Sequence, residues 1–316
     1  MMIRATAIAL TILTAVTAMA QDDAPLTGDW ELVTESAQWG PRDTAEPFVL
    51  DGKLWISNGY YHGNVLYPDL WVSENGRSWR MVIEKTPYPA YAEMVIYDGK
   101  VWAIKESVWN STDGVNWQQV AESTPFGKRG YGEAVVHDGK IFQLGSGSDV
   151  YSTTDGVNWE CAATGAPYGA RAGSAVASYD GKLWLMGGRV GTPNDPPEEG
   201  YEQWTTFNDV WVSEDGATWE RVLEHAPWAE RTWFVAEVYA GRLWIIGGYD
   251  NVHHANFADV WYTEDGVTWH EMPTPEDFKS RHESTPWVFE GSLWIAGGNT
   301  WPVLNDVWKL TVAPEE

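Results

Sequence analysis

A two-part motif recurs six times along the chain, and this periodicity restricts the fold more than any other feature. The first part is a turn, usually Asp-Gly-Lys, followed by an apolar stretch. The second part is a stretch such as Val-Trp, then an acidic residue with Gly, then another Trp. Gly takes the positive φ that a tight hairpin needs, so Asp-Gly between alternating stretches indicates β-hairpins. Each repeat therefore predicts four short antiparallel strands. The first-part turns begin at Asp51, Asp98, Asp138, Asp180, Ala240 and Glu290.

The sixth repeat ends after Asn305-Asp306-Val307-Trp308 and lacks its outer strand. A matching strand occurs at the other end of the chain, at residues 28–33. We therefore predict an all-β fold: a six-bladed β-propeller of four-stranded antiparallel blades, closed when the N-terminal strand pairs into the last blade. The propeller should span residues 28–312, with a short linker at 21–27 and a tail at 313–316.

Three features carry a resemblance to the kelch-repeat propellers, the group that includes the central domain of galactose oxidase. They are an Arg before the first strand, an Asp-Val-Trp strand, and a double Gly at 187–188, 247–248 and 297–298. The resemblance implies a propeller but not one function, because this fold serves binding modules and enzymes alike. Ser-x-Asp-Gly-x-x-Trp turns are also similar to the Asp-box of sialidase propellers, although they are one residue shorter, which favours kelch. We place these turns at Ser73, Ser111, Ser152 and Ser213.

The first twenty residues indicate export from the cytoplasm. Arg4 precedes an apolar run, and Ala18-Met19-Ala20 forms a small-x-small site, which is typical of a cleaved secretory signal peptide; an uncleaved anchor is the alternative. Every later apolar stretch is too short to cross a bilayer, so we expect no membrane span. The mature protein should be periplasmic or secreted. The single Cys161 allows no internal disulfide and suits a bacterial export route.

Charge limits the ligands that the protein can bind. The formal charge of −25 disfavours nucleic acid and anionic lipid, which bind basic surfaces. In five repeats an Arg lies nine residues before the turn, and we expect these side chains to form a ring near the channel mouth. Guanidinium groups bind carboxylate or sulfate through paired hydrogen bonds. The alternative is that these Arg belong to the kelch architecture and pair with loop carbonyls. The five are Arg42, Arg129, Arg171, Arg231 and Arg281.

Two further residue sets accompany this ring. Glu46, Glu93 and Glu133 lie four residues after the Arg position, where they are candidates for general acid and base catalysis or for ion pairs with the ring. Several Trp lie outside the repeated strands, where a flat ring can stack on a sugar or pack within a loop. The candidates are Trp39, Trp204, Trp228 and Trp301.

His253 and His254 are weak candidates for a metal site, because adjacent side chains in extended chain point apart. We predict no metal and no cofactor. Copper radical chemistry like that of galactose oxidase is not expected, because it requires a Cys crosslinked to a Tyr. Cys161 instead belongs to an outer strand, away from the channel.

The sequence favours a binding or scaffold module that recognises a protein partner or an acidic glycan on the Arg-bearing loop face. We expect a monomer. The alternative is an enzyme acting on acidic sugars, an isomerase or hydrolase that resembles the kelch-type sialic acid mutarotases. In that case the Arg ring would hold the carboxylate and a Glu would move protons.

Overall fold

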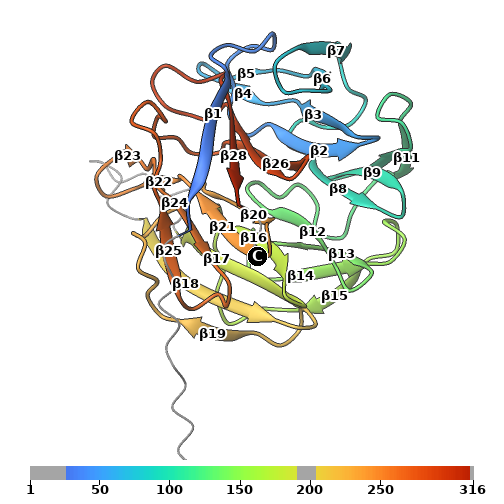
Figure 1. Ribbon diagram of the computed structural model, residues 1–316. Coiled ribbons are helices and arrows are strands. Elements are labelled where there is room, and N and C mark those ends of the chain that lie inside the picture. Colours follow the sequence, from blue (N-terminus) through green and yellow to red (C-terminus); the bar gives the residue numbers. More distant parts are fainter. Residues whose placement is uncertain (1–25, 191–203, 314–316) are drawn as a thin grey trace, which may run out of the picture.

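The computed structural model describes residues 26–190 and 204–313, which form an all-β, six-bladed propeller (Figure 1). The predicted fold class is confirmed. The expected signal peptide at residues 1–20 lies outside the described residues. Within the described ranges, the chain has no helix with the length and apolar character needed to span a membrane.

Each blade is a four-stranded antiparallel sheet. The first strands of neighbouring blades contact one another, so these six strands surround a central channel. Blade 1 comprises β2 (Glu46–Leu50), β3 (Lys53–Ser57), β6 (Leu70–Ser73) and β7 (Trp79–Ile83). Blade 2 comprises β8 (Glu93–Tyr97), β9 (Lys100–Ile104), β10 (Val108–Ser111) and β11 (Gln118–Ala121). Blade 3 comprises β12 (Glu133–His137), β13 (Lys140–Leu144), β14 (Val150–Thr153) and β15 (Glu160–Ala163). Blade 4 comprises β16 (Ala175–Tyr179), β17 (Lys182–Val190), β18 (Thr205–Ser213) and β19 (Glu220–Leu223). Blade 5 comprises β20 (Val235–Tyr239), β21 (Arg242–Ile246), β24 (Val260–Thr263) and β25 (Trp269–Met272). Blade 6 comprises β26 (Thr285–Phe289), β27 (Ser292–Ala296), β28 (Val307–Val312) and β1 (Gly28–Thr34).

The ring closes through the N-terminal strand, as predicted. Strand β1 pairs antiparallel with β28, in a register that runs from Gly28 opposite Val312 to Leu32 opposite Trp308. Figure 1 shows the two strands side by side although they come from opposite ends of the sequence. This pairing covers the edge that β28 would otherwise expose.

The repeated Gly and the second-strand aromatics pack against each other between blades. A Cβ atom on Gly76 would lie 2.3 Å from the ring of Trp294, and one on Gly266 would lie 1.9 Å from the ring of Trp184. Only Gly leaves room for such contacts, and its positive φ also suits the turn. The abundance of Trp therefore largely reflects packing between blades. The same contact joins Gly114 to Trp55, Gly156 to Trp102 and Gly216 to Phe142.

A hydroxyl residue fixes each of these turns by accepting a hydrogen bond from the Gly amide. The donor–acceptor distance is 2.9 Å at Ser73 and 3.0 Å at Ser111. In blade 3 the acceptor is Thr153 at 3.0 Å rather than Ser152, which corrects the sequence assignment by one residue. The error arose because both neighbouring residues carry a hydroxyl.

Two small hairpins and two long strands enlarge one end of the propeller. The hairpins are β4 (Tyr60–Tyr61) with β5 (Val65–Leu66) and β22 (Tyr249–Asp250) with β23 (Ala255–Asn256). Both bond to the segments that lead into first strands, through Asp43 with Tyr60 and Thr232 with Tyr249. We call this end the mouth of the channel.

Candidate functional site

Four of the five predicted ring arginines are buried in ion pairs rather than facing the channel mouth. Each has a relative exposure of 4% or less and binds an Asp side chain with both terminal nitrogens, at 2.6 to 3.2 Å. Each also donates to a backbone carbonyl at the end of the second strand. The predicted geometry was therefore wrong for these residues, because a partner carboxylate already occupies each guanidinium fork. The pairs are Arg42 with Asp69, Arg171 with Asp209, Arg231 with Asp259 and Arg281 with Asp306.

The remaining arginine, Arg129, also serves the loops. It donates to the carbonyls of Ser146 and Asp149 at 2.8 and 3.0 Å and lies against the ring of Tyr151. Blade 2 has Pro89 at the Arg position. The described Arg positions thus tie the incoming loop to the second and third strands, as in the architectural alternative considered from the sequence. Arg129 differs from the other four because it also lines the cavity at the mouth.

Two residues after the Arg position, every blade places a residue in the left-handed region of backbone space. The φ values lie between 49° and 65°, and only one of the six residues is Gly. All six line one cavity at the mouth. We call them the collar: Thr44, Tyr91, Tyr131, Gly173, Trp233 and Glu283.

Backbone hydrogen bonds join most of the collar into a chain around the axis. The amide of Thr44 donates to Glu283, that of Glu283 to Trp233, that of Trp233 to Gly173, and that of Gly173 to Tyr131, at 2.8 to 3.3 Å. This bonding demands the left-handed conformation, which costs about 1–2 kcal/mol at a residue other than Gly. Gly is the unstrained choice, yet five blades carry larger side chains. Strain that clusters at a cavity is a pointer to function.

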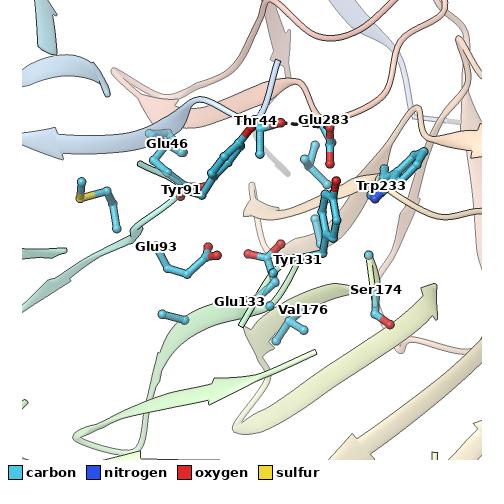
Figure 2. A pocket seen from close by; sticks show the side chains of 18 of the residues that line it. Thr44, Glu46, Tyr91, Glu93, Tyr131, Glu133, Ser174, Val176, Trp233 and Glu283 are labelled. Carbon is cyan, nitrogen blue, oxygen red and sulfur yellow. Dashed lines mark hydrogen bonds between the residues drawn. The ribbon is translucent and has the colours of Figure 1, made fainter. Parts of the chain in front are cut away.

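The cavity enclosed by the collar has a volume of about 550 Å³. Two residues beyond the collar, blades 1 to 3 contribute Glu46, Glu93 and Glu133, which we call the glutamate trio. Blades 4 to 6 contribute Ala175, Val235 and Thr285 at the same register. Blades 1 to 3 thus place one carboxyl group each at this register, and the rest of the lining mixes apolar residues such as Val176 and Phe234 with Glu237 and Glu283. In Figure 2 the carboxyl groups of Glu93 and Glu133 point toward one another, and Trp233 lies on the far side of the pocket.

Burial and mutual repulsion raise the pKa values of the trio. Burial raises the pKa of Glu46 to about 7, although Lys105 and the amide of Met94 oppose the shift. Burial and the charges of its two trio neighbours raise the pKa of Glu93 well above its ordinary value. Burial, with Glu46 and Glu283, does the same for Glu133. Each side chain lines the cavity but is surrounded by protein, and this burial favours the uncharged acid over the carboxylate.

Lys105 is a positively charged residue that acts on Glu46 and Glu93 of the trio. Its side chain is buried, and its ammonium group donates to the carbonyl of Tyr91 at 2.6 Å. It lowers the pKa values of Glu46 and Glu93, but not enough to cancel the effect of burial. The trio therefore retains an electrostatic demand for additional positive charge or for protons.

The four loop tryptophans proposed as stacking platforms have different surroundings. Trp39 and Trp228 are almost fully buried and pack on Trp79 and Trp269, so the loop-packing alternative holds for them. Trp301 is 80% exposed.

Trp204, the fourth, belongs to a stack beside the cavity. The guanidinium of Arg189 lies between the rings of Trp204 and Trp233, at 3.9 and 4.0 Å. The stack holds one edge of the collar in place, since Trp233 is a collar residue.

The two adjacent histidines bind separate partners. His253 forms an ion-pair contact of 2.7 Å with Asp250, and His254 lies 3.3 Å from the hydroxyl of Tyr249. They lie in the turn between β22 and β23, where His254 has a φ of 54°, and not in the extended chain that the sequence argument assumed.

Sequence reasoning missed the collar and its neighbours Asp43 and His282. The Arg and Glu positions were found because they repeat, whereas the intervening positions hold different residues in most blades. Their fixed offset from the Arg position was the available signal. No protein-family model matches this chain, and no curated protein shows significant similarity to it.

Proposed function

We propose that the chain is an exported, kelch-type binding propeller that recognises a protein partner through the mouth of its channel. The positively charged side chain of a partner lysine or arginine would enter the cavity and meet the glutamate trio. The observation that carries this proposal is the gathering of buried carboxyl groups, the glutamate trio among them, in the lining of a cavity that also has apolar residues.

Electrostatics favours a cation in this position. The raised pKa values of Glu93 and Glu133 reflect burial and the repulsion between nearby carboxylates, and a bound ammonium or guanidinium group relieves that repulsion. Tyr91, Tyr131 and Trp233 surround the entrance, where aromatic faces attract cations. The apolar residues of the lining suit the methylene stem that lysine and arginine carry.

An acidic glycan fits less well than the sequence suggested. Four of the arginines that were expected to hold its carboxylate are already paired with aspartates. A ligand carboxylate in the cavity would meet the glutamate trio as well as Lys105, Lys128 and Arg129.

A binding experiment on residues 21–316 tests the proposal. Calorimetry would compare a lysine-containing peptide, the same peptide with norleucine in place of lysine, and an acidic sugar. We expect binding of the lysine peptide alone, and stronger binding as the pH rises from 6 to about 8, because trio protons must leave. The replacement Glu93→Gln should weaken binding about tenfold or more, because it removes one charge from the cavity. Glu160→Gln, on the exposed outer strand β15, is the matched control.

Two results would count against this function. One is binding of the acidic sugar in preference to the lysine peptide. The other is equal affinity in wild-type protein and Glu93→Gln.

A specific observation favours an enzyme as the second candidate. Glu93 and Glu133 point toward one another, and carboxyl groups with raised pKa values suit a general acid and base acting on a sugar (Figure 2). This alternative retains the isomerase or hydrolase reading, with a neutral sugar fitting the cavity better than an acidic one. Glu133→Gln should then abolish turnover of the sugar, followed by NMR, while its binding persists. Sugar binding without turnover would exclude the enzyme.

A further inference from the structure

Three potential metal ligands converge where the propeller closes, between blades 6 and 1. Asp43 follows Arg42, and His282 and Glu283 follow Arg281, so two buried ion pairs anchor the segments that carry them. One ligand atom from each of the three side chains lies within 4.8 Å of the other two. A separation of this size suits donors that share one ion.

The tautomer of His282 is set by its surroundings. Its Nδ1 lies 2.6 Å from the side-chain oxygen of Asn256. The orientation of the Asn256 amide is itself fixed, because its nitrogen donates to the backbone carbonyl of Asn299 at 2.8 Å. Nδ1 of His282 therefore carries the proton, and Nε2 keeps a free lone pair. Metal-binding histidines commonly have their other ring nitrogen held in this way.

The two carboxylates are also oriented by neighbouring side chains. The side-chain amide of Asn299 donates to Oδ2 of Asp43. The hydroxyl of Thr44 lies 3.0 Å from Oε2 of Glu283 (Figure 2). The same hydroxyl lies 2.8 Å from Oδ1 of Asp43, so one proton serves two carboxylates. The pair is short of hydrogen-bond donors, and a cation between the carboxylates would supply the missing positive charge.

A second, independent observation comes from His62 in the loop between β4 and β5. Its Nε2 is buried and has no hydrogen-bond partner among the described residues. An unpaired buried nitrogen is costly. The hairpin that carries this ring is hydrogen-bonded to Asp43 through Tyr60, two residues before His62, which brings the ring toward the cluster. A metal ion would give this nitrogen a partner.

We propose that Asp43, His282 and Glu283 bind a zinc ion, with His62 as the residue positioned to supply a fourth ligand. One or two imidazoles with two carboxylates form a mixed nitrogen and oxygen set that zinc accepts. The two carboxylate charges balance the charge of the ion. Because Glu283 belongs to the collar, the ion would lie in the wall of the cavity. The zinc ligands are distinct from the glutamate trio, although Glu283 lines the same cavity as the trio.

Calorimetric titration of residues 21–316 with zinc chloride tests the site. We expect one equivalent to bind, and binding to weaken about tenfold or more in Asp43→Asn and in His282→Gln, by comparison with the losses seen even for outer-shell partners. His253→Ala is the control, because it removes an exposed His–Asp pair outside the cluster, and it should bind zinc as the wild type does. Glu93→Gln should also keep zinc affinity, which separates this result from the test of the peptide site.

Two further measurements make the outcome decisive. Cobalt substituted for zinc should give a visible absorption spectrum that changes in His62→Ala if this residue is a ligand. Circular dichroism of each zinc-free variant checks that it is folded. If His282→Gln does not fold, the test rests on Asp43→Asn, which keeps the shape of the side chain. The site is disproved if the wild type binds no stoichiometric zinc, if Asp43→Asn binds it equally well, or if His253→Ala abolishes binding.

Discussion

Replacing Tyr131 with Gly should stabilise the protein relative to Ala at the same position, which reverses the usual order of these two residues. Tyr131 is a collar residue with φ of 59°, and its side chain is 49% exposed. Its truncation therefore removes little buried surface. Ala and Gly both remove the ring, so the comparison between them isolates the backbone.

The size of the effect follows from two opposing quantities. An L residue in the left-handed region costs about 1–2 kcal/mol, which Gly does not pay. Gly also lowers the free energy of unfolding by about 0.4–1 kcal/mol, because it gives the unfolded chain more conformational freedom than Ala does. The Gly variant should therefore exceed the Ala variant by about 0.5–1 kcal/mol in free energy of unfolding. In a strand or helix interior, Gly is instead less stable than Ala by about 0.5–1 kcal/mol.

Urea unfolding followed by Trp fluorescence measures this difference, provided that both variants keep the same slope with denaturant. The same pair should both bind the lysine peptide less well than the wild type, because each lacks the ring at the entrance. If Ala proves as stable as Gly or more stable, the collar conformation is not what determines stability at Tyr131, and the argument from strain fails.

Three more predictions concern the frame around the site. Deleting residues 28–34 should leave β28 unpaired and cause aggregation or a large fall in melting temperature, and an unchanged melting curve would refute closure by β1. Arg231→Ala should cost about 3–5 kcal/mol in free energy of unfolding because Asp259 is left without its partner, whereas Arg129→Ala should cost less than half as much because it loses only carbonyl contacts; denaturant titration would reveal equal losses if this is wrong. Burial raises the pKa of Glu237 to about 7 from 4.5, so its folded form favours the proton: the stability this gives is complete below pH 4.5 and is lost as the pH rises through 7. Glu237→Gln should therefore flatten the fall of melting temperature over that pH window, and parallel curves for variant and wild type would contradict the assignment.

The positions of the strands and turns could be predicted from the sequence because the same pattern recurs in each repeat. The turns, the Trp positions and the missing outer strand all follow from comparing six versions of one motif. The Glu positions of the trio follow in the same way. Closure by residues 28–33 followed from simple complementarity between the two ends of the chain.

The geometry of the arginines could not be predicted, although both partners were present. The Asp partners lie 27, 38, 28 and 25 residues after Arg42, Arg171, Arg231 and Arg281. Loop length varies between the second and third strands, so a search for fixed spacing finds the Arg and loses the Asp. Without that Asp, a repeated cation next to a channel suggests a ligand site.

The collar was hidden for a different reason. Thr, Tyr, Trp and Glu rarely adopt the left-handed conformation, so no residue type marks the position. The bonding between neighbouring blades imposes it, and only three-dimensional structure reveals that bonding. The convergence of Asp43 with His282 depends on the same circular closure, because the two residues belong to opposite ends of the chain.

A propeller built from repeats contains its own comparison between architecture and function. At the Arg position most of the described blades have an Arg in a buried ion pair with an Asp. That position therefore stabilises the fold. Two residues later the backbone is equally uniform, with φ between 49° and 65°, but the side chains differ in nearly every blade. Gly173 shows what the backbone alone requires, and a Cβ at that position would lie 2.3 Å from the hydroxyl of Thr232. The other five side chains are retained against conformational strain, and all of them line the cavity. Recognition should therefore depend on the positions where the repeats share a backbone and differ in chemistry, which places the site at the collar rather than at the arginines.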